Sequence, residues 1–159
     1  MSGFQQTLEQ VLVLSTFIPL IISSGGNSGS QAATLIIQAL ALGEITIQDW
    51  WRIARREIKS GFFMGLTLGL LGFLIVMIGH HSLGLFGPHY ATVGLAIGTA
   101  LTGVVLWGTM MGSMLPLLLK RMGADPATSS TPFIATLVDV TGLLIYFGTA
   151  YWMLSDLLG

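Results

Sequence analysis

Asp139 is the one acidic residue that lies well inside a long apolar segment, seven residues after Pro132. A charged carboxylate near the centre of a bilayer costs about 2.5 to 3.5 kcal/mol even on lenient insertion scales, so such residues usually face a partner or a watery cavity. No Lys or Arg lies at comparable depth in any apolar segment. We therefore expect a cation, a proton or a water-filled path beside Asp139. The alternative is a protonated carboxyl that is hydrogen-bonded to a neighbouring helix.

The neighbours of Asp139 favour a cation. Thr136 and Gly142 lie three residues on either side and Thr131 lies two helical turns earlier, which gives a small, polar helix face with room for water. Mg2+ suits such a place because it prefers oxygen ligands and gives up its water reluctantly. The chain has no cysteine, so a bound metal must be held by oxygen or imidazole. Mn2+, Co2+ and Ca2+ stay open as alternatives.

A second polar patch, residues 23–31, interrupts the first apolar segment and contains Gly25 and Gly26. Non-helical backbone at membrane depth must be buried in protein or line a cavity. Asn27 and Gln31 are four residues apart and share a helix face, which fits a pore wall. The alternative is a loop, but the flanking stretches 8–22 and 32–42 are each too short to span a membrane. We expect one long helix, weakened or kinked at its glycines.

Weaker candidates lie in the connections. Asp125 and Thr131 each precede a proline, as helix caps often do, although Asp125 could also assist an ion at an inner gate. The outer connection carries three histidines that could bind zinc or sense pH, but their spacing fits no zinc pattern and solvated loop residues explain them. The three are His80, His81 and His89.

Motifs for catalysis are missing from the sequence. It has no Gly-x-Ser-x-Gly elbow, no His-Glu-x-x-His pair and no phosphate loop, so we do not expect an enzyme. A paired-aspartate intramembrane protease would need a second buried carboxyl, which only a second copy of the chain could supply. A net charge of −1 without a basic run also argues against binding to nucleic acid.

The composition indicates an all-α integral membrane protein surrounded by lipid. Hydrophobic residues make up 53% of the 159 residues and charged residues 8%, and the mean hydropathy is +0.82. We expect one pore domain over residues 1–159, built as a bundle of four transmembrane helices with a short interfacial helix. The predicted helices are 5–42, 59–80, 90–120 and 132–157, and the interfacial helix is 46–58. Glycines spaced four apart, such as Gly61, Gly65 and Gly69, are assigned to helix packing.

The basic residues predict the topology. All six lie in two connections, at residues 52–59 and 120–121, which the positive-inside rule makes cytoplasmic. Both termini are then non-cytoplasmic, in a multi-pass protein of the cell (inner or plasma) membrane. An outer N-terminus at the very edge of a membrane helix suggests a preceding helix that this chain lacks.

Three stretches resemble the MgtE family of magnesium channels. Residues 19–41, with Gly-Gly-Asn-Ser-Gly-Ser-Gln, resemble the family's second membrane helix, and Met114-Leu115-Pro116 fits its fourth. Residues 124–146, with Ala-Asp-Pro-Ala and Asp-Val-Thr-Gly, resemble its inner loop and fifth helix. The resemblance covers essentially the whole chain. The four helices would then correspond to family helices two to five.

The resemblance implies a homodimer whose second and fifth helices line a central pore. Asp139 matches the pore aspartate that selects Mg2+, and Asn27 and Thr34 lie on the stretch that shapes its surroundings. Asp125 matches an acidic residue at the cytoplasmic end, and Thr131 stands where many members have an asparagine. The family also has a first helix and cytoplasmic regulatory domains, which would be supplied by the same or another chain.

The sequence therefore predicts a path for hydrated Mg2+ with Asp139 as its selectivity site. The alternative within transport is a cation-coupled exporter, as in the related solute carrier family 41. The alternative from another class is a non-conducting membrane assembly module whose polar face binds a partner helix.

Overall fold

The protein is a bundle of four long helices. The computed structural model describes residues 2–128 and 131–158, and the side chains of residues 12–127 and 131–154. The long helices are α1 (Ser2–Leu42), α2 (Trp50–Leu83), α3 (Tyr90–Arg121) and α4 (Thr131–Leu158), and the 3-10 turns η1 (Ile47–Asp49) and η2 (Pro126–Thr128) precede α2 and α4. Each long helix contains a stretch long and apolar enough to cross a membrane. The predicted all-helical architecture is confirmed.

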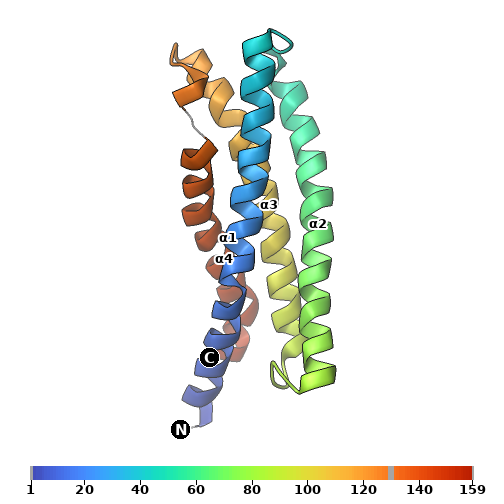
Figure 1. Ribbon diagram of the computed structural model, residues 1–159. Coiled ribbons are helices and arrows are strands. Elements are labelled where there is room, and N and C mark those ends of the chain that lie inside the picture. The colour runs from blue at the N-terminus through green and yellow to red at the C-terminus, as the bar shows by residue number, and fades with distance from the viewer. Residues whose placement is uncertain (1, 129–130, 159) are drawn as a thin grey trace.

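Helix α3 lies at the centre of the bundle. It packs against the other three long helices, while α2 and α4 lie on opposite sides of it and α1 also contacts α4 (Figure 1). The α1–α2 and α3–α4 connections lie at one end, and both termini lie at the other with the α2–α3 connection. This is the arrangement of an even number of crossings.

All six basic residues lie at the end that carries the α1–α2 and α3–α4 connections, which we call the basic end. Four of them fall in the first three turns of α2, and Lys120 and Arg121 close α3. The predicted topology requires this clustering, and the bundle provides it. The side of the membrane that the basic end faces stays a prediction.

Glycines bring α3 into close contact with its two neighbours. On the α2 side, a Cβ built at Gly65 would lie 2.7 Å from the carbonyl oxygen of Thr102, so only a hydrogen fits there. On the α1 side, a Cβ at Gly112 would overlap the carbonyl oxygen of Gly29. The predicted packing role of the spaced glycines is confirmed for both crossings, because small residues let helix backbones approach.

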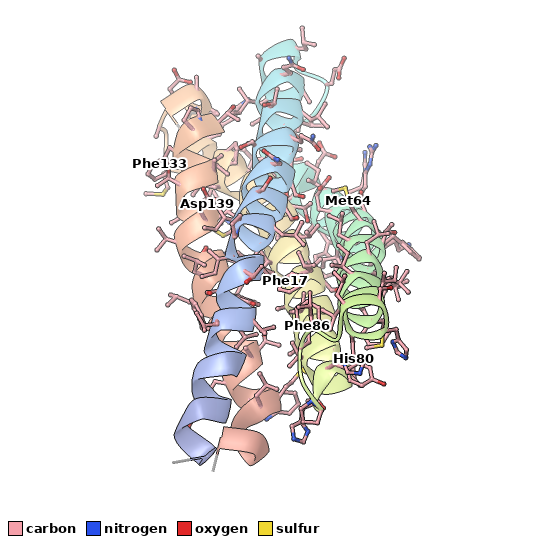
Figure 2. The ribbon with its side chains drawn as sticks, turned by 60° about the horizontal axis from the view of Figure 1, so that its bottom comes forward. Phe17, Met64, His80, Phe86, Phe133 and Asp139 are labelled. Carbon is pink, nitrogen blue, oxygen red and sulfur yellow. The ribbon has the colours of Figure 1, made fainter. Side chains whose placement is uncertain are left out.

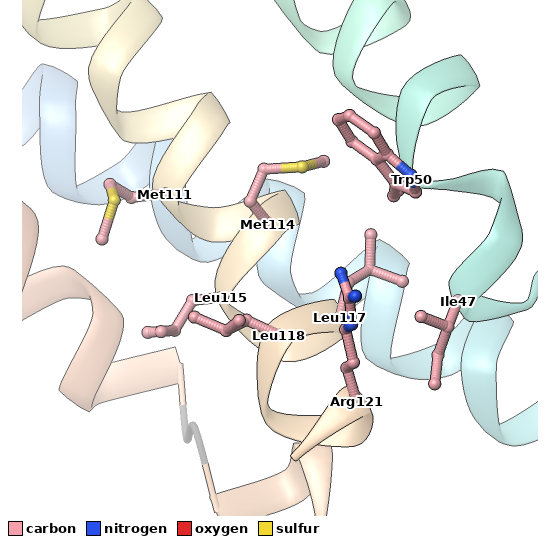
Figure 3. A pocket seen from close by; sticks show the side chains of 8 residues that line it. All are labelled: Ile47, Trp50, Met111, Met114, Leu115, Leu117, Leu118 and Arg121. Carbon is pink, nitrogen blue, oxygen red and sulfur yellow. The ribbon is translucent and has the colours of Figure 1, made fainter.

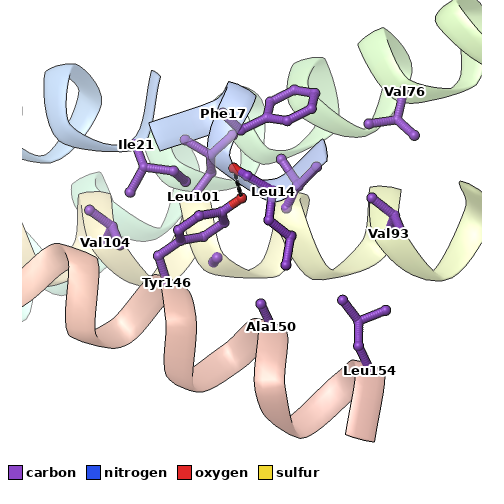
Figure 4. Close-up of a cluster of buried hydrophobic side chains, with 12 residues drawn as sticks. Leu14, Phe17, Ile21, Val76, Val93, Leu101, Val104, Tyr146, Ala150 and Leu154 are labelled. Carbon is purple, nitrogen blue, oxygen red and sulfur yellow. Dashed lines mark hydrogen bonds between the residues drawn. The ribbon is translucent and has the colours of Figure 1, made fainter. Parts of the chain in front are cut away.

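The core between α1, α3 and α4 is apolar and contains a buried tyrosine. The Tyr146 hydroxyl donates a 2.7 Å hydrogen bond to the carbonyl oxygen of Leu14, which ties α4 to α1 (Figure 4). Ile21, Leu101 and Val104 pack around it and are almost fully buried. A buried phenol needs such a partner, since an unpaired hydroxyl in an apolar core is costly.

The start of α2 differs from the prediction. Residues 46–58 do not form a separate interfacial helix: after η1, one helix runs without a break from Trp50 to Leu83. No glycine or proline interrupts residues 50–60, and Ile53 is buried in a cluster with Ile36, Leu40 and Leu117. Packing on the ends of α1 and α3 therefore holds this segment upright as the first turns of the crossing helix. Helix α1 also continues unbroken through Gly25 and Gly26.

Candidate functional site

Asp139 faces Gly26 across the contact between α4 and α1. A Cβ built at Gly26 would overlap Oδ1 of Asp139, so the carboxylate occupies the space that a side chain on α1 would fill. Figure 2 shows Asp139 on the side of α4 that is turned toward α1. Two residues from the two predicted constellations are thus brought together.

The Asp139 carboxylate is poorly satisfied in the single chain. Its Oδ1 is buried and has no hydrogen-bond partner. Among the described side chains, the one ion pair joins Arg52 to Asp49 at 3.4 Å, near the start of α2. Nor do the described residues contain a group of three His, Asp or Glu side chains that could hold a metal. Such an unpaired buried carboxylate oxygen calls for a partner from outside the chain, because leaving it unsatisfied costs free energy.

A polar groove lies between α1 and the start of α4, toward the basic end. Its volume is about 490 Å3 and it is lined by Ser30, Gln31, Thr34, Leu35 and Thr131. The Thr34 and Thr131 hydroxyl oxygens are 3.4 Å apart, and Ser30 Oγ lies 3.4 Å from the Thr131 carbonyl oxygen. These separations are long for hydroxyl hydrogen bonds, so the oxygens keep capacity for water or a hydrated ion.

Other predicted polar residues are exposed on the surfaces of α1 and α4. Asn27 and Gln31 on α1 and Thr136 on α4 are open in the single chain. Asn27 Nδ2 donates to Ser23 Oγ at 3.2 Å, and the Thr136 hydroxyl donates to the Pro132 carbonyl oxygen at 3.0 Å. Their remaining polar atoms are available to a partner surface, which is unusual for a face at membrane depth.

Gly25 and Gly142, also predicted to line the path, are turned into the bundle. A Cβ at Gly25 would lie 2.6 Å from Val104 Cγ1, and one at Gly142 would lie 3.0 Å from the same atom. Both residues are buried. In this chain they serve the packing of α1 and α4 on α3.

Asp125 is separated from Asp139. It lies in the connection before η2, where its Oδ1 accepts a 2.9 Å hydrogen bond from the Ala127 backbone N–H. The predicted capping role is therefore present. Thr131 begins α4, and Asp139 lies eight residues further on, about 12 Å along the helix axis.

A hydrogen bond near Asp139 was not predicted from the sequence. Trp107 on α3 donates from Nε1 to Oγ1 of Thr141 at 2.8 Å, two residues beyond Asp139. A tryptophan in an apolar segment needs an acceptor for its N–H, so the sequence indicates that Trp107 has a hydrogen-bond partner. It does not indicate which residue the partner is.

The histidines lie at the opposite end of the bundle. His80 stacks on Tyr90 with ring centroids 3.7 Å apart, and its Nδ1 is 2.9 Å from the Leu85 carbonyl oxygen. His81 Nδ1 is 2.8 Å from the Met77 carbonyl oxygen. The His80 ring therefore joins the end of α2 to the α2–α3 connection and to Tyr90 of α3, whereas His81 bonds within its own helix.

The geometry defines a class of protein: a helical bundle suited to a membrane, with an unpaired carboxylate oxygen at a glycine contact and a groove lined by hydroxyl side chains nearer the basic end. A profile of the MgtE family, described as a divalent cation transporter, matches residues 18–149. The chain belongs to the MgtE family.

Relatives named magnesium transporter MgtE show the same similarity. The one from Thermus thermophilus is 41% identical over 155 residues, which cover 98% of this chain and 32% of the relative. Those from Enterococcus faecalis and Bacillus subtilis are each 32% identical over 149 residues, which cover 94% of this chain and 31% of the relative. The chain thus spans about a third of the length of these curated relatives.

Proposed function

We propose that two copies of this chain pair through the α1–α4 face and conduct hydrated Mg2+ across a membrane, with Asp139 as the selectivity site. The observation that carries the proposal is the Asp139 carboxylate, whose Oδ1 is buried against Gly26 without a hydrogen-bond partner. The names of the relatives, magnesium transporter MgtE, supply the identity of the ion. Mn2+, Co2+ and Ca2+ are the competing ions to test.

A second copy supplies what one chain lacks. One Asp139 gives a single negative charge, whereas two carboxylates across a two-fold axis concentrate a divalent cation. The exposed polar residues beside it, Asn27, Gln31 and Thr136, would then face water in a path rather than lipid. The hydroxyl groups of Ser30, Thr34 and Thr131 in the groove continue this row of polar side chains toward the basic end.

Flux measurements test the role of Asp139. Vesicles reconstituted with the chain and loaded with a Mg2+-sensitive dye should show uptake that Asp139→Asn, which removes the charge and keeps the shape, lowers at least tenfold. Asp49→Asn is the matched control, because Asp49 pairs with Arg52 outside the proposed path. Full uptake by Asp139→Asn would refute the proposal.

The same vesicles distinguish the two alternative functions. Uptake that depends on an opposing proton or sodium gradient would identify an exporter, and absence of any flux from a folded protein would favour an assembly module.

Cross-linking tests the pairing. The chain contains no cysteine, so one introduced cysteine reports one position. Gln31→Cys should form an intermolecular disulfide, which needs the two Cα atoms within about 7 Å. Leu74→Cys, exposed on α2 away from this face, should stay a monomer on a gel. Equal cross-linking at both positions would exclude a dimer through the α1–α4 face.

A further inference from the structure

An apolar pocket lies at the basic end, between the start of α2 and the end of α3. Its volume is about 270 Å3, and Figure 3 shows the side chains around it. It shares no residue with the polar groove beside Thr131. The lining residues are Ile47, Trp50, Met111, Met114, Leu115, Leu117, Leu118 and Arg121.

The walls of this pocket suit hydrocarbon. Seven of the eight lining side chains are aliphatic, thioether or aromatic, and a stable buried water needs two to four polar partners. Leu118 and Trp50 at its edge are 52% and 51% exposed, so the pocket is open at the surface of the bundle. In a membrane, an open apolar pocket at this depth meets lipid chains.

Arg121 gives the pocket one charged wall. Its side chain extends between Leu118 and Ile47 in Figure 3. Within residues 12–127 and 131–154, Arg121 makes no ion pair. The ion pair found there at the basic end joins Arg52 to Asp49. A guanidinium has a planar fork of donors that matches phosphate, and it is weakly hydrated for a cation. The residue therefore suits an anionic headgroup at the mouth of an apolar slot.

We propose that this pocket binds an anionic phospholipid, with one acyl chain along the apolar walls and the headgroup phosphate on Arg121. The charge at this end supports the choice, since basic residues next to membrane helices attract anionic lipids. Basic pockets between helices recognise such headgroups. A soluble phosphate would make no use of the seven apolar walls.

Lipid retention tests the headgroup contact. The full chain, purified in detergent and mixed with equal amounts of phosphatidylglycerol and phosphatidylcholine, should retain phosphatidylglycerol preferentially in native mass spectrometry. Arg121→Gln should weaken that retention about tenfold or more, the effect of losing a charge-assisted hydrogen bond. Arg52→Gln removes the same charge at the same end, where Asp49 already pairs with it, and should change retention less than twofold.

A second pair of variants tests the acyl chain. Leu118→Trp places a bulky ring at the pocket and should displace the lipid, whereas Leu66→Trp, on the exposed surface of α2 outside the pocket, should not. Glycerol phosphate without acyl chains should compete at least a hundredfold more weakly than phosphatidylglycerol. Circular dichroism confirms that each variant is folded.

Three results would overturn the proposal. Equal loss in Arg121→Gln and Arg52→Gln would show a diffuse charge effect, and unchanged retention in Leu118→Trp would show that the lipid lies elsewhere. Strong competition by glycerol phosphate would assign the site to a free phosphate. None of these readouts measures Mg2+ flux, so they are independent of the transport proposal.

Discussion

Two helix contacts in this bundle are built from glycines but differ in the residue that faces the glycine: one is a hydrogen-bonded threonine and the other an aspartate with an unpaired carboxylate oxygen. Between α2 and α3, Gly65 and Gly69 meet Thr102, whose hydroxyl donates to the Gly98 carbonyl oxygen at 2.9 Å and lies 3.2 Å from that of Gly65. Between α1 and α4, Gly26 meets Asp139, whose Oδ1 has no partner.

The residue opposite the glycine decides what the contact does. The threonine hydroxyl donates a hydrogen bond to a carbonyl oxygen of its own helix, and the side chain fills the space opposite the glycines. The α2–α3 contact therefore contributes packing. An ionised carboxylate can only accept hydrogen bonds, so the role proposed for the α1–α4 contact is to hold a cation or its water. We expect stability to depend on the first contact and ion binding on the second.

Breaking the α2–α3 contact should have the largest effect on stability. Gly65→Ala brings a Cβ within 2.7 Å of the Thr102 carbonyl oxygen, and overpacking of this kind costs about 1 to 3 kcal/mol. Thermal unfolding in detergent measures the loss. Gly148→Ala is the matched control, because nothing lies within 4 Å of its Cβ, and it should leave stability unchanged or raise it by up to about 1 kcal/mol through helix propensity. Equal losses of stability in Gly65→Ala and Gly148→Ala would contradict the packing role of Gly65 at the α2–α3 contact.

Adding Mg2+ should stabilise the protein through Asp139. A ligand at ten times its dissociation constant stabilises the folded state by about 1.4 kcal/mol, so the melting temperature should rise with Mg2+ concentration. Asp139→Asn should remove this rise, since the charge is lost. Asp49→Asn should keep it. A rise of the same size in Asp139→Asn would place the ion at another site.

Double variants at the α1–α4 contact should show coupling between Gly26 and Asp139. Gly26→Ala forces the carboxylate out of its rotamer at a cost of about 0.5 to 1.5 kcal/mol, and this cost should vanish when Asp139 is also alanine. Gly25→Ala contacts Val104 instead, so its cost should be the same with or without Asp139. Unfolding of the single and double variants gives the coupling. Additive costs for Gly26 and Asp139 would count against their contact.

The smallest expected effect is at Thr102. Thr102→Ala removes a hydroxyl that bonds within α3 and reaches the Gly65 carbonyl oxygen on α2, and such bonds in membrane helices average about 0.6 kcal/mol. Thr67→Ala removes a hydroxyl that bonds only to Phe63 of its own helix and is exposed, so it should cost less. Unfolding measures both. A larger loss at Thr67 would reverse the comparison.

The number of long helices followed from the sequence, and so did their approximate ends apart from the start of α2, because the apolar segments are long and the connections are polar. The error at residues 46–58 came from assigning a basic, tryptophan-flanked segment to the membrane surface. Its two buried residues, Ile53 and Ala54, hold it against the bundle instead. Two apolar positions in a charged segment do not reveal which helices will cover them.

The unusual position of Asp139, a carboxylate within an apolar segment, was readable from the sequence, but its contact with Gly26 was not. Gly25 and Gly26 are adjacent, so they point about 100° apart on α1, one toward Val104 and one toward Asp139. Their identical side chains carry no information about which helix each one meets. The bond between Trp107 and Thr141 depends in the same way on the rotation of two helices.

The central place of α3 also bears on how the chain is assembled during synthesis. Chains emerge from the ribosome with their N-terminal parts first, so α1 and α2 are made before α3. The glycines Gly29 on α1 and Gly65 on α2 both meet their contacts on α3. Helices α1 and α2 are therefore made before the helix that their glycines contact, and these two contacts form only once α3 has been made.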